Sequence, residues 1–324
     1  MAIINLLDLQ PTTISRDLKD KYLLLYGPTK CGKTTFAAQV PNNLIFSFEK
    51  GTNFLGGIYS VPIEKWSTFK LFLKQLNKPE LKQKFNTVTI DTLSIAWTLC
   101  EQYICDTAGV DSIASIPWGR GYSLLKDEFS DALRQISMMG YGIILITHAK
   151  IKSTKIDEDT TIETMSPNIP DRAQDVVNAL VDIIGCIKVT PHADGTADRT
   201  LITRSTPYIV AGSRLRYLAP EIPFGYQELV DAMREAIDRQ EADGDVVLDT
   251  TSTQTVVTER SYEDALAEAR TIWEGFLKTP NPEETIEKAN RVVEKIMKRP
   301  CRISEIRPDQ IDLLELVIEE LKTL

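Results

Sequence analysis

Short apolar runs alternate with longer amphipathic runs along the chain from Tyr22 to about Ile209. The apolar runs predict buried strands at 22–26, 44–48, 87–90, 142–147, 181–189 and 199–203. The amphipathic runs predict helices at 34–39, 66–75, 94–103, 124–138 and 171–179. Strands that alternate with helices are typical of a mostly parallel sheet covered on both faces, so the pattern predicts an α/β fold.

The pattern changes after Tyr226. Residues 236–259 pass from a fraying acidic helix into a segment rich in Thr and Ser, which predicts a flexible linker. Three helical runs follow at 262–277, 282–298 and 308–321, and Ser261, Pro282 and Pro308 supply their start signals. We therefore expect an α/β domain at 1–235, a linker at 236–259 and a small acidic helical domain at 260–324.

Composition restricts the class of protein. The chain has 324 residues and is 43% hydrophobic, which is enough to bury a core. No run approaches the roughly 18–20 apolar residues of a membrane span. The N-terminus lacks the basic start and apolar stretch of a secretion signal. Five scattered cysteines, without paired metal spacing, are typical of a reducing compartment, so we expect a cytoplasmic protein with no membrane segment.

The net charge of -9 is unevenly distributed. Residues 217–324 carry 24 acidic and 13 basic side chains, whereas residues 1–216 carry 22 acidic and 24 basic ones. This balance argues against a general nucleic-acid coat protein, but not against a local basic groove.

The segment 27–34, GPTKCGKT, matches the phosphate-loop motif G-x-x-x-x-G-K-[ST], between a buried strand and a helix. Successive backbone N–H groups in such a loop converge on phosphate oxygens. Lys33 would reach the β- and γ-phosphates of ATP, and the Thr34 hydroxyl would bind Mg²⁺. The expected nucleotide contacts are Gly27, Pro28, Thr29, Lys30, Cys31, Gly32, Lys33, Thr34 and Thr35.

Asp91 ends the apolar strand in FNTVTIDTLS and is the expected second Mg²⁺ residue, acting through a water molecule. The strand at 44–48 lies between the loop's helix and the Asp91 strand along the chain. Many kinases and GTPases place the two motifs on neighbouring strands, whereas RecA-like and AAA+ proteins have a strand between them. Thr92 follows Asp91, where AAA+ proteins usually carry a glutamate.

On these motifs, residues 15–230 resemble the RecA-like ATPases, and most of all the phage-encoded nucleotide-binding proteins, including RecA-core single-strand annealing recombinases. The resemblance implies a RecA-like three-layer sandwich. It also implies that Lys33, Glu49 and His148 are catalytic. Glu49 stands where these proteins orient the attacking water. His148, in GIILITHAK, stands at the γ-phosphate sensor, which is glutamine in RecA.

RecA-like proteins also insert a basic residue into the neighbouring subunit's ATP site. Arg214 is the first candidate for this role and Arg204 the second. An arginine acting in trans implies a homo-oligomer with head-to-tail contacts. A surface arginine with no such role is the alternative.

The resemblance also places two DNA-binding loops. Trp118, Arg120 and Tyr122 would form an aromatic and basic set in the first loop, or they would pack as a lid over the core. Lys150 and Lys152 lie at the start of a long polar segment, where the second DNA-binding loop would be. Acidic residues at 157–159 make a solvated mixed-charge loop an equal alternative.

Two functions fit these expectations. The first is ATP-dependent DNA recombination or single-strand annealing, in the host cytoplasm if the protein is phage-encoded. The second is a RecA-core ATPase that acts on a protein partner through residues 260–324, as a replication accessory, loader, or defence or regulatory switch. A small-molecule kinase fits poorly, because no arginine-rich lid segment is present.

Overall fold

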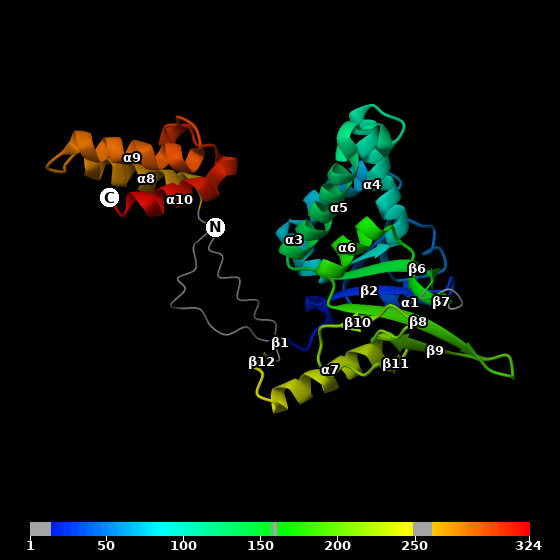
Figure 1. Cartoon of the computed structure of the whole chain (residues 1–324). Helices are drawn as coiled ribbons and strands as arrows, with labels where there is room; N and C mark the ends of the chain where they lie inside the picture. Colours follow the sequence, from blue (N-terminus) through cyan, green and yellow to red (C-terminus); the bar gives the residue numbers. More distant parts are fainter. Residues whose placement is uncertain (1–13, 156, 158–160, 249–260) are drawn as a thin grey trace. The chain divides into compact units, whose positions relative to one another are not determined.

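The computed structural model describes residues 14–155, 157, 161–248 and 261–324. These residues form two compact units, one within 14–248 and one within 261–324 (Figure 1). Each unit has a buried core of its own.

A largely parallel sheet forms the centre of the larger unit, with the order β11-β9-β8-β2-β6-β5-β3-β4 along its main path. The parallel strands are β2 (Tyr22–Gly27), β3 (Asn43–Ser47), β4 (Tyr59–Pro62), β5 (Thr87–Asp91), β6 (Gly142–Lys155) and β8 (Ile183–Pro191). Antiparallel pairs add β9 (Ala197–Ile202), β10 (Gly212–Ser213) and β11 (Glu221–Pro223) beyond β8. The mostly parallel sheet that the sequence predicts is confirmed.

Helices cover both faces of this sheet (Figure 1). One face carries α2 (Trp66–Leu76), α3 (Pro79–Lys84), α4 (Leu93–Ala108), α5 (Arg120–Met138) and α6 (Asp171–Leu180), and the other carries α1 (Lys33–Gln39) and α7 (Tyr226–Ala242). Successive side chains of a strand point to opposite faces. Accordingly, Leu24 belongs to the core under α2, α4 and α5, while Leu23 and Leu25 pack with Phe36 of α1 and Met233 of α7.

Aromatic side chains join the helices of the first face. The Trp66 ring lies 5.8 Å from that of Phe129, and the Trp97 ring lies 5.0 Å from the same phenylalanine. All three side chains are almost completely buried. Burying a large apolar side chain contributes on the order of 2 kcal/mol, so this cluster fixes α2, α4 and α5 over the sheet.

The expected strands and helices of the larger unit are all present, with most ends shifted by a few residues and β6 extended further, to Lys155. The strand that separates β2 from β5 in the sheet is β6, not the segment 44–48, which forms β3 on the far side of β5. Strand β4, at the edge of the sheet, was not expected from the sequence. Its side chains are exposed or half-buried, so it lacks a continuous apolar run.

The expectation of an irregular polar segment after Lys150 is wrong. Strand β6 continues to Lys155 and pairs in antiparallel register with β7 (Thr161–Pro167). Residues 156 and 158–160, which include part of the acidic run, lie outside the described residues. The hairpin escapes a hydrophobicity pattern because most side chains of this outer part of β6 are exposed and polar.

The smaller unit contains α8 (Tyr262–Phe276), α9 (Pro282–Met297) and α10 (Ile311–Leu321). Ser261 caps α8, because its side chain accepts a hydrogen bond from the backbone N–H of Asp264. A core that includes Ala269, Val293 and Leu314 holds the helices together. Two 3₁₀ turns, Ile303–Glu305 and Pro308–Gln310, connect α9 to α10.

Helix α7 continues to Ala242, past the boundary expected at residue 235. A short parallel pair, β1 (Ile14–Ser15) with β12 (Val247–Leu248), follows it. Residues 249–260 of the expected linker lie outside the described residues. Within the described parts of the chain, none of the helices has the length and hydropathy needed to cross a bilayer.

Candidate functional site

The phosphate loop connects the carboxyl end of β2 to the start of α1. Lys30 and Gly32 have positive φ angles of 61° and 101°, so the backbone turns tightly before the helix. A Cβ atom on Gly27 would lie 2.9 Å from the Ile187 Cβ of β8, which leaves no space for a side chain. The loop can therefore present backbone N–H groups at close range, as phosphate binding requires.

Lys33 is buried and lies against the loop itself. Its Nζ donates to the carbonyl oxygens of Gly27 at 3.1 Å and Pro28 at 2.6 Å, and lies 3.7 Å from the Cys31 Sγ. A buried ammonium needs such acceptors, because an unpaired charge in the interior is costly. These carbonyls hold the ammonium group next to the loop in which a phosphate would bind.

Thr34 and Asp91 meet at the base of the loop. The Thr34 hydroxyl donates to the Asp91 Oδ2 at 2.6 Å. A Cβ on Gly51 would lie 3.6 Å from the Thr34 Oγ1 and 4.0 Å from the Asp91 Oδ2, so the absence of a side chain keeps space open beside both oxygens. A hydroxyl, one carboxylate and phosphate oxygens are a typical Mg²⁺ environment, so this pair fits the ion.

Burial raises the pKa of Asp91 above the ordinary carboxyl value. The hydrogen bond from Thr34 lowers the pKa and the nearby charge of Glu49 raises it, but burial is the largest influence. The folded protein therefore disfavours the carboxylate that a metal ion needs. A divalent cation at this position would restore the balance in favour of the charged form.

Glu49 and His148 form a second pair next to the first. The backbone of β3 runs alongside β5, and the N–H of Glu49 donates to the Asp91 carbonyl at 3.3 Å. His148 lies opposite Gly27 in the register of β6 with β2. The His148 Nε2 is 3.2 Å from the Glu49 Oε2. The buried His148 Nδ1 has no hydrogen-bond partner among the described residues.

The carboxyl ends of β2, β3, β5 and β6 thus bring the expected site residues together. The structure places Lys33, Thr34, Glu49, Asp91 and His148 at the carboxyl edge of the sheet, linked by the contacts above. In the described residues no group of three or more His, Cys, Asp or Glu side chains could hold a metal. A Mg²⁺ ion here would therefore depend on Thr34, Asp91 and ligand oxygens.

Arg199 is a residue of the site that the sequence pattern did not single out. The β8–β9 hairpin extends beyond the phosphate loop, and the Arg199 Nη1 lies 3.4 Å from the Cys31 carbonyl oxygen. A Cβ on Gly32 would lie 2.9 Å from the same guanidinium nitrogen. The Asp194-Gly195 turn of the hairpin was the available signal, because this dipeptide is typical of tight hairpins.

Arg214 lies at the opposite edge of the sheet. Its guanidinium pairs with the Asp182 Oδ1 at 3.1 Å and donates to the carbonyl of Ala179 at 2.8 Å. Asp182 in turn contacts the backbone of Tyr22, the first residue of β2, whereas the phosphate loop follows the last. Arg214 thus closes the end of α6 within its own chain, and a role in a neighbour's site would require giving up these bonds.

The three residues of the expected first DNA loop have separate environments. Trp118 is fully exposed, at 101% of its reference area, in a turn just before α5. Arg120 is the first residue of α5 and is exposed. The Tyr122 ring lies under the guanidinium of Arg172, at 4.0 Å, and packs against the core. Tyr122 is therefore a packed residue, while Trp118 and Arg120 are accessible.

Lys150 and Lys152 lie on the β6–β7 hairpin. The Lys150 Nζ donates to the Ile169 carbonyl at 2.7 Å, so this ammonium is engaged within the chain. Lys152 is exposed and lies opposite Thr164 of β7. Of the two lysines, Lys152 is the one that solvent reaches freely.

The raised pKa of Asp91 predicts a stability effect. An acid whose pKa is higher in the folded state destabilises the fold as pH rises through that range. Asp91→Asn removes the charge and keeps an oxygen that can accept from Thr34. We expect the nucleotide-free variant to melt about 2–4 °C higher at pH 8, the shift that ~1 kcal/mol produces in a domain of this size.

Differential scanning fluorimetry at pH 5 and pH 8 measures this difference, and the gain should be larger at pH 8. Asp111→Asn, at an exposed position, is the matched control and should leave the melting temperature unchanged. An Asp91→Asn variant that melts lower than the parent at pH 8 would contradict the interpretation.

Comparison with known proteins agrees with this geometry. Residues 19–215 match the model of a family described as an AAA domain. The SPbeta prophage-derived uncharacterized protein YorG of Bacillus subtilis (strain 168) is 24% identical over 334 residues, which covers 99% of this chain and 98% of that protein. The matched segment holds the phosphate loop, Glu49, Asp91 and His148. Since it spans more than half of the sequence, the chain belongs to the AAA-domain family of P-loop ATPases.

Proposed function

We propose that the protein is a Mg²⁺-dependent, RecA-like ATPase of phage type that acts in DNA recombination or single-strand annealing. The observation that carries the ATPase proposal is the adjacency of two residue pairs, Thr34 with Asp91 and Glu49 with His148. The first pair suits the metal of a nucleotide, and the second suits an attacking water. The prophage origin in the relative's name supports a phage protein.

Each residue of the site has a defined task in this proposal. The loop N–H groups and the Lys33 ammonium bind the triphosphate, and Lys33 must leave the Gly27 and Pro28 carbonyls to reach it. Bound Mg²⁺ would neutralise charge on the phosphate oxygens and would be held by Thr34 and Asp91. The Glu49 carboxylate accepts a hydrogen bond from the attacking water and orients it.

His148 connects nucleotide binding to Glu49. Its Nε2 is within hydrogen-bond distance of the Glu49 carboxylate, although the expected task of this residue is to contact the γ-phosphate. One ring nitrogen cannot serve both partners at once. A phosphate that attracts the imidazole would therefore release Glu49 toward water.

The RecA-like assignment is supported by the sheet order. Strand β6 lies between β2 and β5 in the sheet. The candidate base Glu49 comes after β3, whereas Asp91 at the end of β5 is not followed by a glutamate. The oligomer remains part of the proposal, because hydrolysis assisted in trans needs a second copy of the chain. Arg204 is exposed and has no described ion-pair partner, so it is the more available of the two candidates.

The DNA role is supported by two accessible groups. Trp118 offers an exposed aromatic face before α5, and Lys152 offers a charge on the β6–β7 hairpin. Bases stack on such aromatics and phosphates pair with such cations. A second candidate function, action on a protein partner, is favoured by a cavity in the helical unit described below.

Glu49→Gln should separate binding from turnover. The variant keeps its size but loses the base, so we expect turnover to fall by roughly 10²–10⁴-fold while ATP affinity is retained. Lys33→Ala should lower both ATP affinity and ATP turnover. Phosphate release and the Kd of a fluorescent ATP analogue provide the measurements, and Glu64→Gln, at an exposed position, is the control. Unchanged turnover in Glu49→Gln would refute the assignment.

Arg199→Gln should weaken nucleotide binding. Its guanidinium already lies over the loop, and a charge-assisted hydrogen bond to phosphate is worth on the order of 2 kcal/mol, so we expect about a thirtyfold higher Kd for ATP. Arg199→Lys should fall between this variant and the parent. Arg134→Gln, at an exposed position of α5, is the control. Equal affinities in all four proteins would mean that Arg199 only supports the loop.

Single-stranded DNA should distinguish the two candidate functions. If the protein acts on DNA, an oligonucleotide should raise ATP turnover at 50 mM salt and much less at 200 mM salt, because phosphate contacts release counterions. Trp118→Ala should reduce the stimulated rate. Met138→Ala, an exposed apolar residue at the other end of α5, should not. If DNA leaves ATP turnover unchanged at both salt concentrations, the protein-partner function is favoured.

A further inference from the structure

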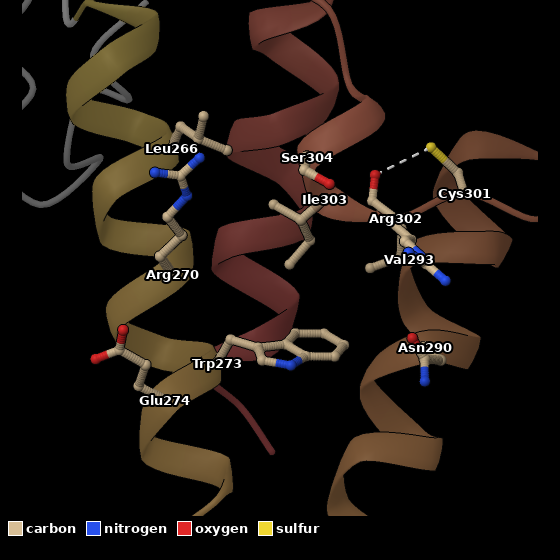
Figure 2. Close-up of a pocket in the computed structure, with 10 residues that line it drawn as sticks. All are labelled: Leu266, Arg270, Trp273, Glu274, Asn290, Val293, Cys301, Arg302, Ile303 and Ser304. Atoms are coloured by element: carbon tan, nitrogen blue, oxygen red, sulfur yellow. Dashed lines mark hydrogen bonds between the residues drawn. The ribbon is translucent and has the colours of Figure 1, made fainter.

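The helical unit contains a cavity at the edge of its core. The cavity has a volume of about 430 Å³ and lies between α8, α9 and the segment 301–304 (Figure 2). Ala269, Leu314 and Ile318 of the buried core do not line it. This volume accommodates one large side chain with part of its backbone, since ligand pockets begin at about 300 Å³.

Four apolar side chains line the cavity, and three of them are accessible. Leu266 and Trp273 come from one face of α8, Val293 from α9, and Ile303 from the 3₁₀ turn. Val293 is buried and forms the floor, while the other three side chains are only partly covered. In Figure 2 the Trp273 indole extends into the space between α8 and α9. Partly exposed apolar walls around a cavity indicate a surface that another molecule covers.

Two arginines flank these walls. Arg270 of α8 and Arg302 both line the cavity and are exposed, and neither makes an ion pair with a described residue. In the same unit Lys288, Arg291 and Lys322 are all paired with glutamates. Glu274 also lines the cavity, but Figure 2 shows its carboxylate on the side of α8 away from the indole.

We propose that this cavity, the α8–α9 pocket, docks an acidic segment of a partner protein that inserts one large apolar side chain. The apolar walls would hold that side chain, and the guanidinium groups of Arg270 and Arg302 would pair with flanking carboxylates. Tryptophan and arginine are the residues most often responsible for binding energy at protein interfaces. The pocket gives the second candidate function a defined site.

The small extent of the positive charge favours a short peptide over a nucleic acid. Residues 261–324 contain 14 acidic and 10 basic side chains, and the basic residues that line the pocket are Arg270 and Arg302. Nucleic-acid strands are held by grooves that follow several phosphates. Two arginines beside one small open pocket match a short acidic segment better.

The test uses the full-length protein and a phage-displayed library of random twelve-residue peptides. We expect selected peptides to share acidic residues next to one Phe, Trp or Leu. A fluorescein-labelled selected peptide should bind the double variant Arg270→Glu/Arg302→Glu at least tenfold more weakly, since like charges across an interface are strongly unfavourable. Replacing the peptide's large apolar residue by Ala should have a similar effect.

Lys278→Glu/Arg299→Glu is the matched control, because it makes the same charge change at exposed residues of the same unit outside the pocket. This control should change peptide affinity less than threefold. Circular dichroism verifies that both double variants are folded without relying on ATP turnover, so failure here is distinct from failure of the ATPase proposal.

Four results would overturn the inference. Three of them concern peptides: no shared sequence among those selected, equal binding by the two double variants, or selection of basic peptides. Binding of a twenty-residue oligo(dT) that is lost specifically in Arg270→Glu/Arg302→Glu would also overturn it, in favour of a nucleic-acid site.

Discussion

The parallel register of β2, β6, β5 and β3 is the constraint on which the site depends. Because these strands run in the same direction, their carboxyl ends lie at one edge, and residues as distant in sequence as Gly27 and His148 become neighbours. The backbone hydrogen bonds that fix this register are buried between two layers of helices. A one-residue slip of β6 would turn His148 to the other face and separate it from Glu49.

The same edge shows how the fold accommodates unfavourable chemistry. Asp91 is a buried carboxyl whose pKa is raised, and Lys33 is a buried ammonium held by main-chain carbonyls. Apolar side chains at these two buried positions would stabilise the fold more than these charged groups do. In the proposed function, Mg²⁺ would stabilise the Asp91 carboxylate and phosphate would stabilise the Lys33 ammonium. The empty site would then lower the stability of the fold, while the same two charges would strengthen nucleotide binding. Stabilising changes at such sites commonly reduce function.

Much of this site follows from local sequence, and its limits have physical causes. The phosphate loop is contiguous, and Glu49, Asp91 and His148 each follow an apolar run, so their order along the chain located them. Arg199 escaped prediction because a hairpin brings it to Cys31 from 168 residues away. The β6–β7 hairpin escaped because most of its outer side chains face solvent. The intrachain bond of Arg214 to Asp182 has no local signature, since it depends on how α6 meets β8.

The central claim is that the loop after β2 binds a nucleoside triphosphate with Lys33 as its movable cation. A crystal structure of the full-length protein with a non-hydrolysable ATP analogue and Mg²⁺ tests this most directly. The account predicts that the Lys33 Nζ leaves the Gly27 and Pro28 carbonyls and contacts the β- and γ-phosphates, with the metal next to Thr34 and Asp91. An analogue bound elsewhere, or a loop in which Lys33 stays on those carbonyls at saturating analogue, would contradict it.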